Sequence, residues 1–261
     1  MKDNSLQSLE LQPISKIPDI NPGDDIADLI CGALQVQDIS IGNGDVIVIT
    51  QKIISKAENR YIHLSTLKPS RRAKIISRKT NKSPQLVELI LRESNEILRY
   101  NKQVIIVEHK LGFICANAGI DQSNIGCDFI KDDQWYLMLP ENPDRSAAII
   151  REILEKKFDV SIGVLIIDSH GRAWRYGTVG ISIGMSGLPG LVDLRGKPDL
   201  YGRTLKITRI GAADELAAGA SLVMGQSVEH IPVVIARGFP YALRDAPLNE
   251  LLRDPERDLF R

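Results

Sequence analysis

Three short apolar runs constrain the fold of this chain more than any other feature of its sequence. They occupy residues 45–50, 161–168 and 230–238, and each is rich in valine and isoleucine with turn-forming residues nearby. Runs of this length and composition are typical of strands buried in a sheet. None of them approaches the ~20 apolar residues that a membrane-spanning helix needs, so we expect no membrane partner.

Helical patterns are interspersed with these strands. The clearest one covers 84–100, with Ser83 as the N-cap and Pro84 in the first turn. Further helices are expected at 24–34, 146–157 and 212–225, further strands at 103–109, 111–117 and 206–211, and loops at 117–135 and 169–204. Because strands and helices do not alternate regularly, the expected fold class is α+β, with mixed or antiparallel sheets and flanking helices.

Length and charge set limits on organisation and partners. The 261 residues suit one large domain or two interlocked lobes, with a flexible N-terminus at 1–12, a main domain at 13–240 and a peripheral tail at 241–261. The 33 basic residues balance the 33 acidic residues, so the overall charge favours neither nucleic acid nor an anionic membrane. Any phosphate-binding site must therefore be local.

Cysteine usage and the N-terminus indicate a cytoplasmic protein. Cys31, Cys115 and Cys127 are an odd number without metal-ligand spacing, which favours reduced thiols over a disulfide framework. The first twelve residues lack the apolar core of a signal peptide.

Two aspartates are the first candidates for chemistry. Asp121 and Asp168 each follow an apolar strand and stand among small polar residues. Carboxylates with amide and hydroxyl oxygens nearby suit a hard cation such as Mg²⁺ or Mn²⁺. The alternative is that both aspartates only cap turns. The chain has no common phosphate-loop motif, no nucleophile elbow and no zinc pattern among its four histidines.

Other segments allow a functional and a structural interpretation. Lys56 follows a strand at a distance that suits phosphate contact, or it is a solvated lysine. Gln226 leaves a helix after a glycine and can present an amide oxygen, or it belongs to a simple C-cap. The glycine-rich run 177–187 allows close approach to a ligand or tight packing, and Trp174 and Tyr176 beside it could stack on a ring.

Five segments taken together resemble a known family, the coenzyme F-420:L-glutamate ligases, which are GTP-dependent gamma-glutamyl ligases. The matching segments are 44–60, 114–124, 165–187, 197–226 and 231–238. The resemblance spans about 13–240 and implies a catalytic domain of two interlocked lobes in an intertwined homodimer. It also implies GTP as co-substrate, two divalent ions (Mg²⁺ or Mn²⁺) and a potassium ion.

The resemblance implies site residues position by position. Asp121, Asp168, Ser169 and Gln226 stand at the metal-ligand positions, where relatives often have Thr for Ser169 and Glu for Gln226. Lys56, Asp121 and Asp168 are the implied catalytic residues. The implied GTP contacts are Ile17, Pro18, Asp19, Ile20, Gln51, Lys52, Lys56, Asn124, Met224, Gly225, Gln226, Ser227, Val228, Glu229, His230 and Ile231.

The implied reaction adds L-glutamate to the deazaflavin coenzyme precursor F-420-0, and further γ-linked glutamates, through an acyl phosphate. Two alternatives stay open. One is a nucleotide-dependent amide ligase that acts on another carboxylate. The other is a non-catalytic carrier that binds deazaflavin or nucleotide, which the pair Asp121 and Asp168 disfavours because binding a ring needs no paired metal ligands.

Overall fold

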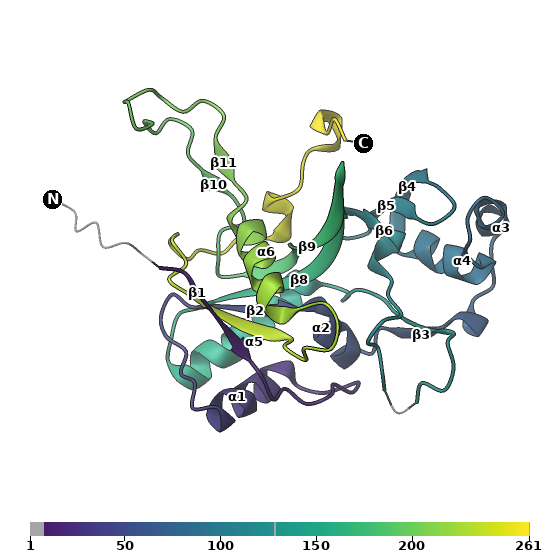
Figure 1. The fold of residues 1–261 in the computed structure, drawn as a ribbon, viewed down its shortest axis with the longest axis horizontal. Helices are drawn as coiled ribbons and strands as arrows, with labels where there is room; N and C mark the ends of the chain where they lie inside the picture. Colours follow the sequence, from purple (N-terminus) through teal and green to yellow (C-terminus); the bar gives the residue numbers. More distant parts are fainter. Residues whose placement is uncertain (1–7, 128, 261) are drawn as a thin grey trace.

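The main sheet of the protein contains the three apolar runs as its central strands. A computed structural model describes residues 8–127 and 129–260, and it confirms a mixed α+β fold (Figure 1). The strand order is β1-β12-β2-β8-β9; β2 and β8 are parallel and the other neighbours are antiparallel. The bounds are β1 Glu10–Ile14, β2 Val46–Thr50, β8 Gly163–Arg172, β9 Arg175–Ser186 and β12 Val233–Arg237.

Three helices cover this sheet: α1 (Ile26–Val36), α5 (Pro143–Phe158) and α6 (Ala212–Met224). The first two have the side-chain N-caps that helices prefer, since Asp25 accepts the Asp28 N–H and Asn142 accepts the Arg145 N–H. α6 packs on β1, β9 and β12, and α5 packs on β8 and β9. β2, β12 and the first half of β8 are buried, as expected for a sheet that helices cover, while most residues of β8 after Ile167 are partly or fully exposed.

A second group of elements lies beside the main sheet, at the right of Figure 1. It holds a three-stranded antiparallel sheet, a two-stranded sheet and three short helices. The bounds are α2 Gln51–Ala57, β3 Tyr61–His63, α3 Arg71–Ser77, α4 Pro84–Arg92, β4 Ser94–Tyr100, β5 Ile105–His109, β6 Ile114–Ala116 and β7 Trp135–Leu137. Most of its buried apolar residues share one core with the main sheet, so the two groups pack together, while Leu64, Leu67 and Leu89 form a small second cluster.

The helix predicted over 84–100 is wrong in its second half. Ser83 is the N-cap, as predicted, but α4 ends at Arg92 and β4 begins at Ser94. At the junction the Ser94 hydroxyl donates to the Ile90 carbonyl, and the Lys110 N–H donates to the Glu93 carbonyl. These bonds end the helix, and pairing with β5 then sets the strand.

The loop predicted over 169–204 is also wrong in its first half. β8 does not end at Asp168 but continues to Arg172 and returns as β9, so the first half of this stretch belongs to a long hairpin. The glycines of β9 serve packing. A Cβ on Gly180 would overlap the Ala217 carbonyl of α6, and one on Gly184 would overlap Pro143 of α5.

Two extensions leave the main body. An arm over 191–210 carries the short pair β10 (Val192–Asp193) and β11 (Arg209–Ile210), and it projects at the top of Figure 1. The tail after 241 is anchored, because the Glu250 carboxylate accepts the N–H groups of Gly190 and Leu191. The 3₁₀ helices are η1 Leu64–Thr66, η2 Asn117–Gly119, η3 Leu248–Glu250 and η4 Pro255–Arg257.

The N-terminal prediction is corrected in part. Residues 10–12, expected in a flexible N-terminus, belong to β1 at the edge of the main sheet, and residues 1–7 lie outside the described part of the chain. Within the described residues, no helix has both the length and the apolar character needed to cross a bilayer.

Candidate active site

A cleft opens at the carboxyl ends of the two parallel strands. β2 ends at Thr50 and leads directly into α2, while β8, whose Ile167 pairs with Thr50, next presents Asp168. This edge of a parallel pair is a common place for ligands. The cleft has a volume of about 490 Å³. Every residue that the sequence predicted for GTP or metal lines it, within the segments 17–20, 51–56, 121–124, 168–169 and 224–231.

A second hollow of about 560 Å³ lies on the outer surface between α3 and β4. Two arginines, three isoleucines and a tyrosine line it, and none of them is a predicted site residue. We therefore take the cleft beside β2 and β8, although it is the smaller of the two, as the candidate site.

Asp121 lies on the loop that follows β6, and a lysine holds it. Lys52 Nζ donates to Asp121 Oδ2 at 2.6 Å and to the Ser123 carbonyl at 2.7 Å. The N–H groups of Gln122 and Ser123 donate to the other carboxylate oxygen. Burial alone would raise the pKa of Asp121, but the hydrogen bond and charge of Lys52, together with Ser123, hold that pKa below its ordinary value.

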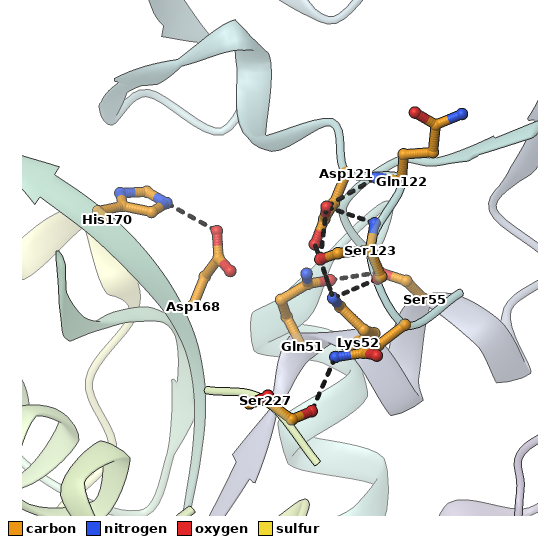
Figure 2. Close-up of polar contacts among 10 residues, drawn as sticks. Gln51, Lys52, Ser55, Asp121, Gln122, Ser123, Asp168, His170 and Ser227 are labelled. Carbon is orange, nitrogen blue, oxygen red and sulfur yellow. Dashed lines mark hydrogen bonds and ion pairs between the residues drawn. The ribbon is translucent and has the colours of Figure 1, made fainter. Parts of the chain in front are cut away.

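Asp168 is held differently, by a histidine on its own strand. His170 Nε2 lies 2.9 Å from Asp168 Oδ2, and the Asp168 side chain is 18% exposed. The two side chains share one face of β8 because they are two residues apart. Figure 2 shows this pair on one wall of the site and the Asp121 loop with Lys52 on the other.

Lys56 is a buried cation and not a solvated surface lysine. It is 8% exposed, and among the described residues its ammonium finds one acceptor, the Gly126 carbonyl at 3.3 Å. Burial lowers the pKa of Lys56, and the charge of Lys52 adds to this effect while Asp19 opposes it. An ammonium has three N–H donors, so Lys56 has capacity to bind an anion in the cleft.

Two further contacts fix the walls of the cleft. Ser55 Oγ donates to Gln51 Oε1 at 2.7 Å, which orients the Gln51 amide within α2. Asn124 Nδ2 donates to the Ser227 carbonyl at 3.1 Å, which ties the Asp121 loop to the segment after α6 (Figure 2).

The segment after α6 wraps its backbone around a carboxylate. The Ser227 N–H donates to Glu229 Oε2 at 2.7 Å. Hydrogen bonds from the backbone N–H groups, first of Ser227 and then of Glu229, Gln226 and Val228, lower the pKa of Glu229. Gly225 allows this curl, since it has φ +73° and a Cβ there would overlap the Glu229 side chain. We call the N–H groups of 226–229 the backbone nest; such nests bind anions.

The donor set fits a hard cation that shares its coordination with a ligand. Asp121, Asp168, Ser169 and Gln226 all line the cleft. No three His, Cys, Asp or Glu residues cluster as a metal cage in the described part of the chain. Mg²⁺ is usually held by one or two carboxylates, waters and substrate phosphates and does not need a full protein cage. Two carboxylates facing a cleft with room for phosphates match that pattern.

Some residues lie elsewhere than their sequence pattern suggested. Trp174 and Tyr176 are at the exposed tip of the β8–β9 hairpin, outside the cleft, where Trp174 packs on Phe260. Ser123 and His170 were not predicted as site residues. The sequence signal for His170 was its position two residues after Asp168. This spacing places both side chains on one face only if the strand continues past Asp168.

Comparison with known proteins shows the family to which the chain belongs. The chain matches the model of the family described as F420-0:Gamma-glutamyl ligase over residues 15–238. It is 46% identical over 255 residues to the coenzyme F420:L-glutamate ligase of Methanothermobacter thermautotrophicus, which covers 97% of this chain and 99% of the relative. The enzymes of that name from Methanopyrus kandleri and Archaeoglobus fulgidus are 42% and 38% identical, over 98% and 97% of this chain and 99% and 96% of their own.

These matches define the class of the protein first: it is a ligase. Because the family model covers most of the chain and the relatives align along almost their whole length, the chain belongs to the F420-0:gamma-glutamyl ligase family.

Proposed function

We propose that the protein joins L-glutamate to the deazaflavin precursor F420-0 through an amide bond and uses GTP to drive the reaction. The observation that carries this proposal is the composition of one cleft. It brings together two carboxylates on opposite walls, two lysines and a backbone nest, which is the set of groups that a metal-bound triphosphate requires. The names of the relatives supply the acceptor and the amino acid.

The proposed reaction has two steps. A carboxylate oxygen of the precursor attacks the γ-phosphorus of GTP, GDP leaves, and an acyl phosphate forms. The amine of L-glutamate then attacks the acyl carbon, loses a proton and expels inorganic phosphate. A carboxylate is a poor electrophile, so an amine cannot displace its oxygen without this activation.

The residues of the chain act mainly by position and charge. Asp121 and Asp168, with Ser169 and Gln226 beside them, hold the divalent ions, and Lys56 places a buried positive charge beside the phosphates. When bound, Mg²⁺ or Mn²⁺ neutralises charge that develops on the phosphates and orients the transfer. The backbone nest accepts a phosphate in place of the Glu229 carboxylate. No covalent enzyme nucleophile is needed.

Mass spectrometry of the coenzyme tests this function directly. After incubation with GTP, Mn²⁺ and L-glutamate, we expect mass gains of whole glutamyl units, together with GDP and phosphate. Omission of GTP and the variant Asp168→Asn are the controls, and both should give no gain. Ligation of a different carboxylate would support the wider amide-ligase class. Binding of the deazaflavin without turnover would support a carrier.

We also propose that the protein is a homodimer whose arm contacts a second copy. Leu200, Tyr201 and Ile207 are large apolar residues on the projecting arm, and each is almost fully exposed. Apolar side chains grouped on a projecting segment are typical of an interaction surface. Light scattering over a wide concentration range should give twice the chain mass, and Leu200→Lys with Ile207→Lys should give the monomer. A wild-type monomer at all concentrations contradicts the dimer.

A further inference from the structure

The hollow between α3 and β4, at the right of Figure 1, exposes apolar side chains to solvent. Ile76 is 7% exposed and belongs to the main core, and Ile97 packs against that core from β4, so the hollow has a buried apolar side. Ile75 and Tyr100 line the same hollow and are 46% and 40% exposed. Large apolar side chains that meet solvent in one place are typical of an interaction surface.

Two arginines complete the lining of the hollow. Arg71 and Arg72 begin α3, and both are exposed. Within residues 8–127 and 129–260, neither of them forms an ion pair. Glu88 of α4, the helix that packs on α3, pairs with Arg92 and accepts the Ser70 N–H. Both guanidinium groups can therefore bind an anion, and a carboxylate suits their planar fork of donors.

The segment around the hollow is basic, although the chain as a whole is neutral. Residues 68–82 contain seven basic residues and no acidic one, which leaves 26 basic and 33 acidic residues in the rest of the chain. The carboxylates that follow on α4 and β4 are Glu88, Glu93 and Glu96, and these three do not line the hollow. A local excess of one charge attracts ligands of the opposite charge, so we expect an acidic occupant.

We propose that this hollow is a docking surface for an acidic segment of a partner protein. Carboxylates of the segment bind Arg71 and Arg72, and a bulky apolar side chain packs on the isoleucines and Tyr100. Arginine and tyrosine are enriched in protein–protein interfaces and among the residues that contribute most to binding. The proposal does not depend on the function proposed for the cleft, because the hollow and the cleft share no lining residue.

Other occupants fit the lining less well. Single-stranded nucleic acid stacks its bases on π-faces, and three of the six lining residues are isoleucines, which have none. A membrane surface takes up apolar side chains that protrude, whereas these side chains surround a hollow. The arm of a second copy, 191–210, contains five basic and two acidic residues, so the basic hollow repels it.

Calorimetric titration of the full chain with short synthetic peptides tests the docking surface. In the first peptide, glutamates flank one leucine and one phenylalanine. A second peptide has glutamine for every glutamate, and a third has serine for the leucine and the phenylalanine. We expect the first to bind and each replacement to weaken binding by about tenfold or more, because each removes one half of the complementary surface. No binding of the first peptide at about 1 mM, or equal binding of the third, overturns the proposal.

Two double variants show whether the peptide occupies the hollow. Arg71→Gln with Arg72→Gln should weaken binding of the first peptide by about three- to thirtyfold, the effect of two exposed ion pairs. The matched control is Lys74→Gln with Arg78→Gln, which removes two exposed charges from the same segment but none from the lining. It should change the affinity by less than about twofold, because salt screens charges that do not touch the peptide. Equal losses in the two double variants mean unspecific attraction and overturn the docking surface.

The same variants distinguish the other occupants. If oligothymidylate or anionic phosphatidylglycerol vesicles bind more tightly than the peptide, and Arg71→Gln with Arg72→Gln removes that binding, the occupant belongs to another class and the proposal is wrong. Loss of a dimer in this double variant identifies a second copy as the occupant and also overturns it. Glutamate ligation should be unchanged in the double variant. Peptide binding by a protein without ligase activity contradicts only the function proposed for the cleft.

Discussion

The two walls of the cleft hold the same kind of residue by different means. On the loop wall, Asp121 has a charged partner, Lys52, and its carboxylate side chain is 37% exposed. On the strand wall, Asp168 has the imidazole of His170 as its partner, and its side chain is 18% exposed. A sequence motif treats the two aspartates alike. The structure shows that one is held by the ammonium of a lysine side chain, and the other by the ring of a histidine within a sheet.

This difference shows that the backbone position of each aspartate and the charge beside its carboxylate are set by different contacts. The Asp121 backbone is fixed by a bridge to Leu137, with hydrogen bonds of 3.0 and 2.9 Å, and its side chain is paired with the partly exposed ammonium of Lys52. The Asp168 backbone lies inside a paired strand, and its partner is buried. We therefore expect the loop wall to be affected most by substitutions that change a charge. We expect the strand wall to be affected most by substitutions that change the shape of a side chain.

The largest effect should come from removing either carboxylate. Asp121→Asn and Asp168→Asn keep the shape of the side chain and remove its charge, and a bound metal supplies several kcal/mol to the transition state, so kcat/KM should fall by roughly 1,000-fold or more in each variant. Steady-state kinetics with the coupled release of phosphate measures this, and circular dichroism confirms the fold. If one variant keeps wild-type turnover, that wall does not hold a catalytic metal ion.

Lys56 should give the next largest effect. Its buried ammonium lies beneath the loop wall, where it donates to the Gly126 carbonyl. Lys56→Met keeps most of the stem and removes a charge-assisted contact worth about 1.5–3 kcal/mol, which corresponds to a loss of roughly 10- to 150-fold in kcat/KM for GTP. A higher KM at constant kcat indicates ground-state binding, and a lower kcat indicates phosphoryl transfer.

An exposed lysine provides the control for that variant. Lys74 lies on the outer helix α3, so Lys74→Met removes the same charge without touching the cleft. Equal kinetics in the two methionine variants would show that Lys56 acts only through the overall charge of the protein.

A variant of Lys52 should show whether this lysine and a metal ion compete for the Asp121 carboxylate on the loop wall. Because Lys52 Nζ holds the oxygen that a metal ion needs, Lys52→Met should bind Mn²⁺ more tightly than the wild type when nucleotide is absent, by up to about fivefold, which is the value of a partly exposed ion pair. The KM for GTP should rise in the same variant. Calorimetric titration with Mn²⁺ measures the first effect. Weaker Mn²⁺ binding would mean that Lys52 organises the wall and does not compete for it.

The smallest effect is the dependence of stability on pH. The pKa of Asp121 is lowered by Lys52, so the pair stabilises the fold fully above the ordinary aspartate pKa of about 3.9, and this stability is lost as the pH falls through the lower pKa of the folded state. The difference in unfolding free energy between wild type and Lys52→Met should stay constant, under about 1 kcal/mol, from pH 7 to 5 and shrink below pH 4. Urea unfolding at each pH measures it; a difference that persists at pH 3 contradicts the assignment.

Much of the fold was accessible from short-range patterns. The apolar runs at 45–50 and 230–238 form central strands, and Ser83 caps a helix as predicted, because burial and capping are properties of neighbouring residues. The helix over 84–100 failed because pairing with β5 decides the state of 94–100, and periodicity within one segment contains no information on its partner.

The sequence predicted well which residues line the candidate site. It predicted less well how these residues contact one another and how deeply they are buried. The family resemblance over about 13–240 was enough to select residues that meet in one cleft, although their roles toward GTP and metal remain predictions. His170 was missed because a single histidine forms no motif, and its meaning depends on β8 continuing past Asp168. Lys56 could not be told from a solvated lysine, since burial is decided by the Asp121 loop folding over α2.

The carboxylate inside the backbone nest has a consequence for selectivity. A phosphate that enters the nest must exchange with Glu229, which already accepts the hydrogen bonds that the phosphate would use. The net affinity of the backbone nest for a phosphate is thus the difference between its binding free energies for the phosphate and for the Glu229 carboxylate. A singly charged ion gains little binding free energy when it replaces the Glu229 carboxylate. A nucleotide that also carries a metal ion and further phosphates makes additional contacts elsewhere in the cleft, and each of them adds binding free energy. For the phosphate site proposed at 226–229, we therefore expect small anions to be poor competitors, even though every one of its donors is a common backbone amide.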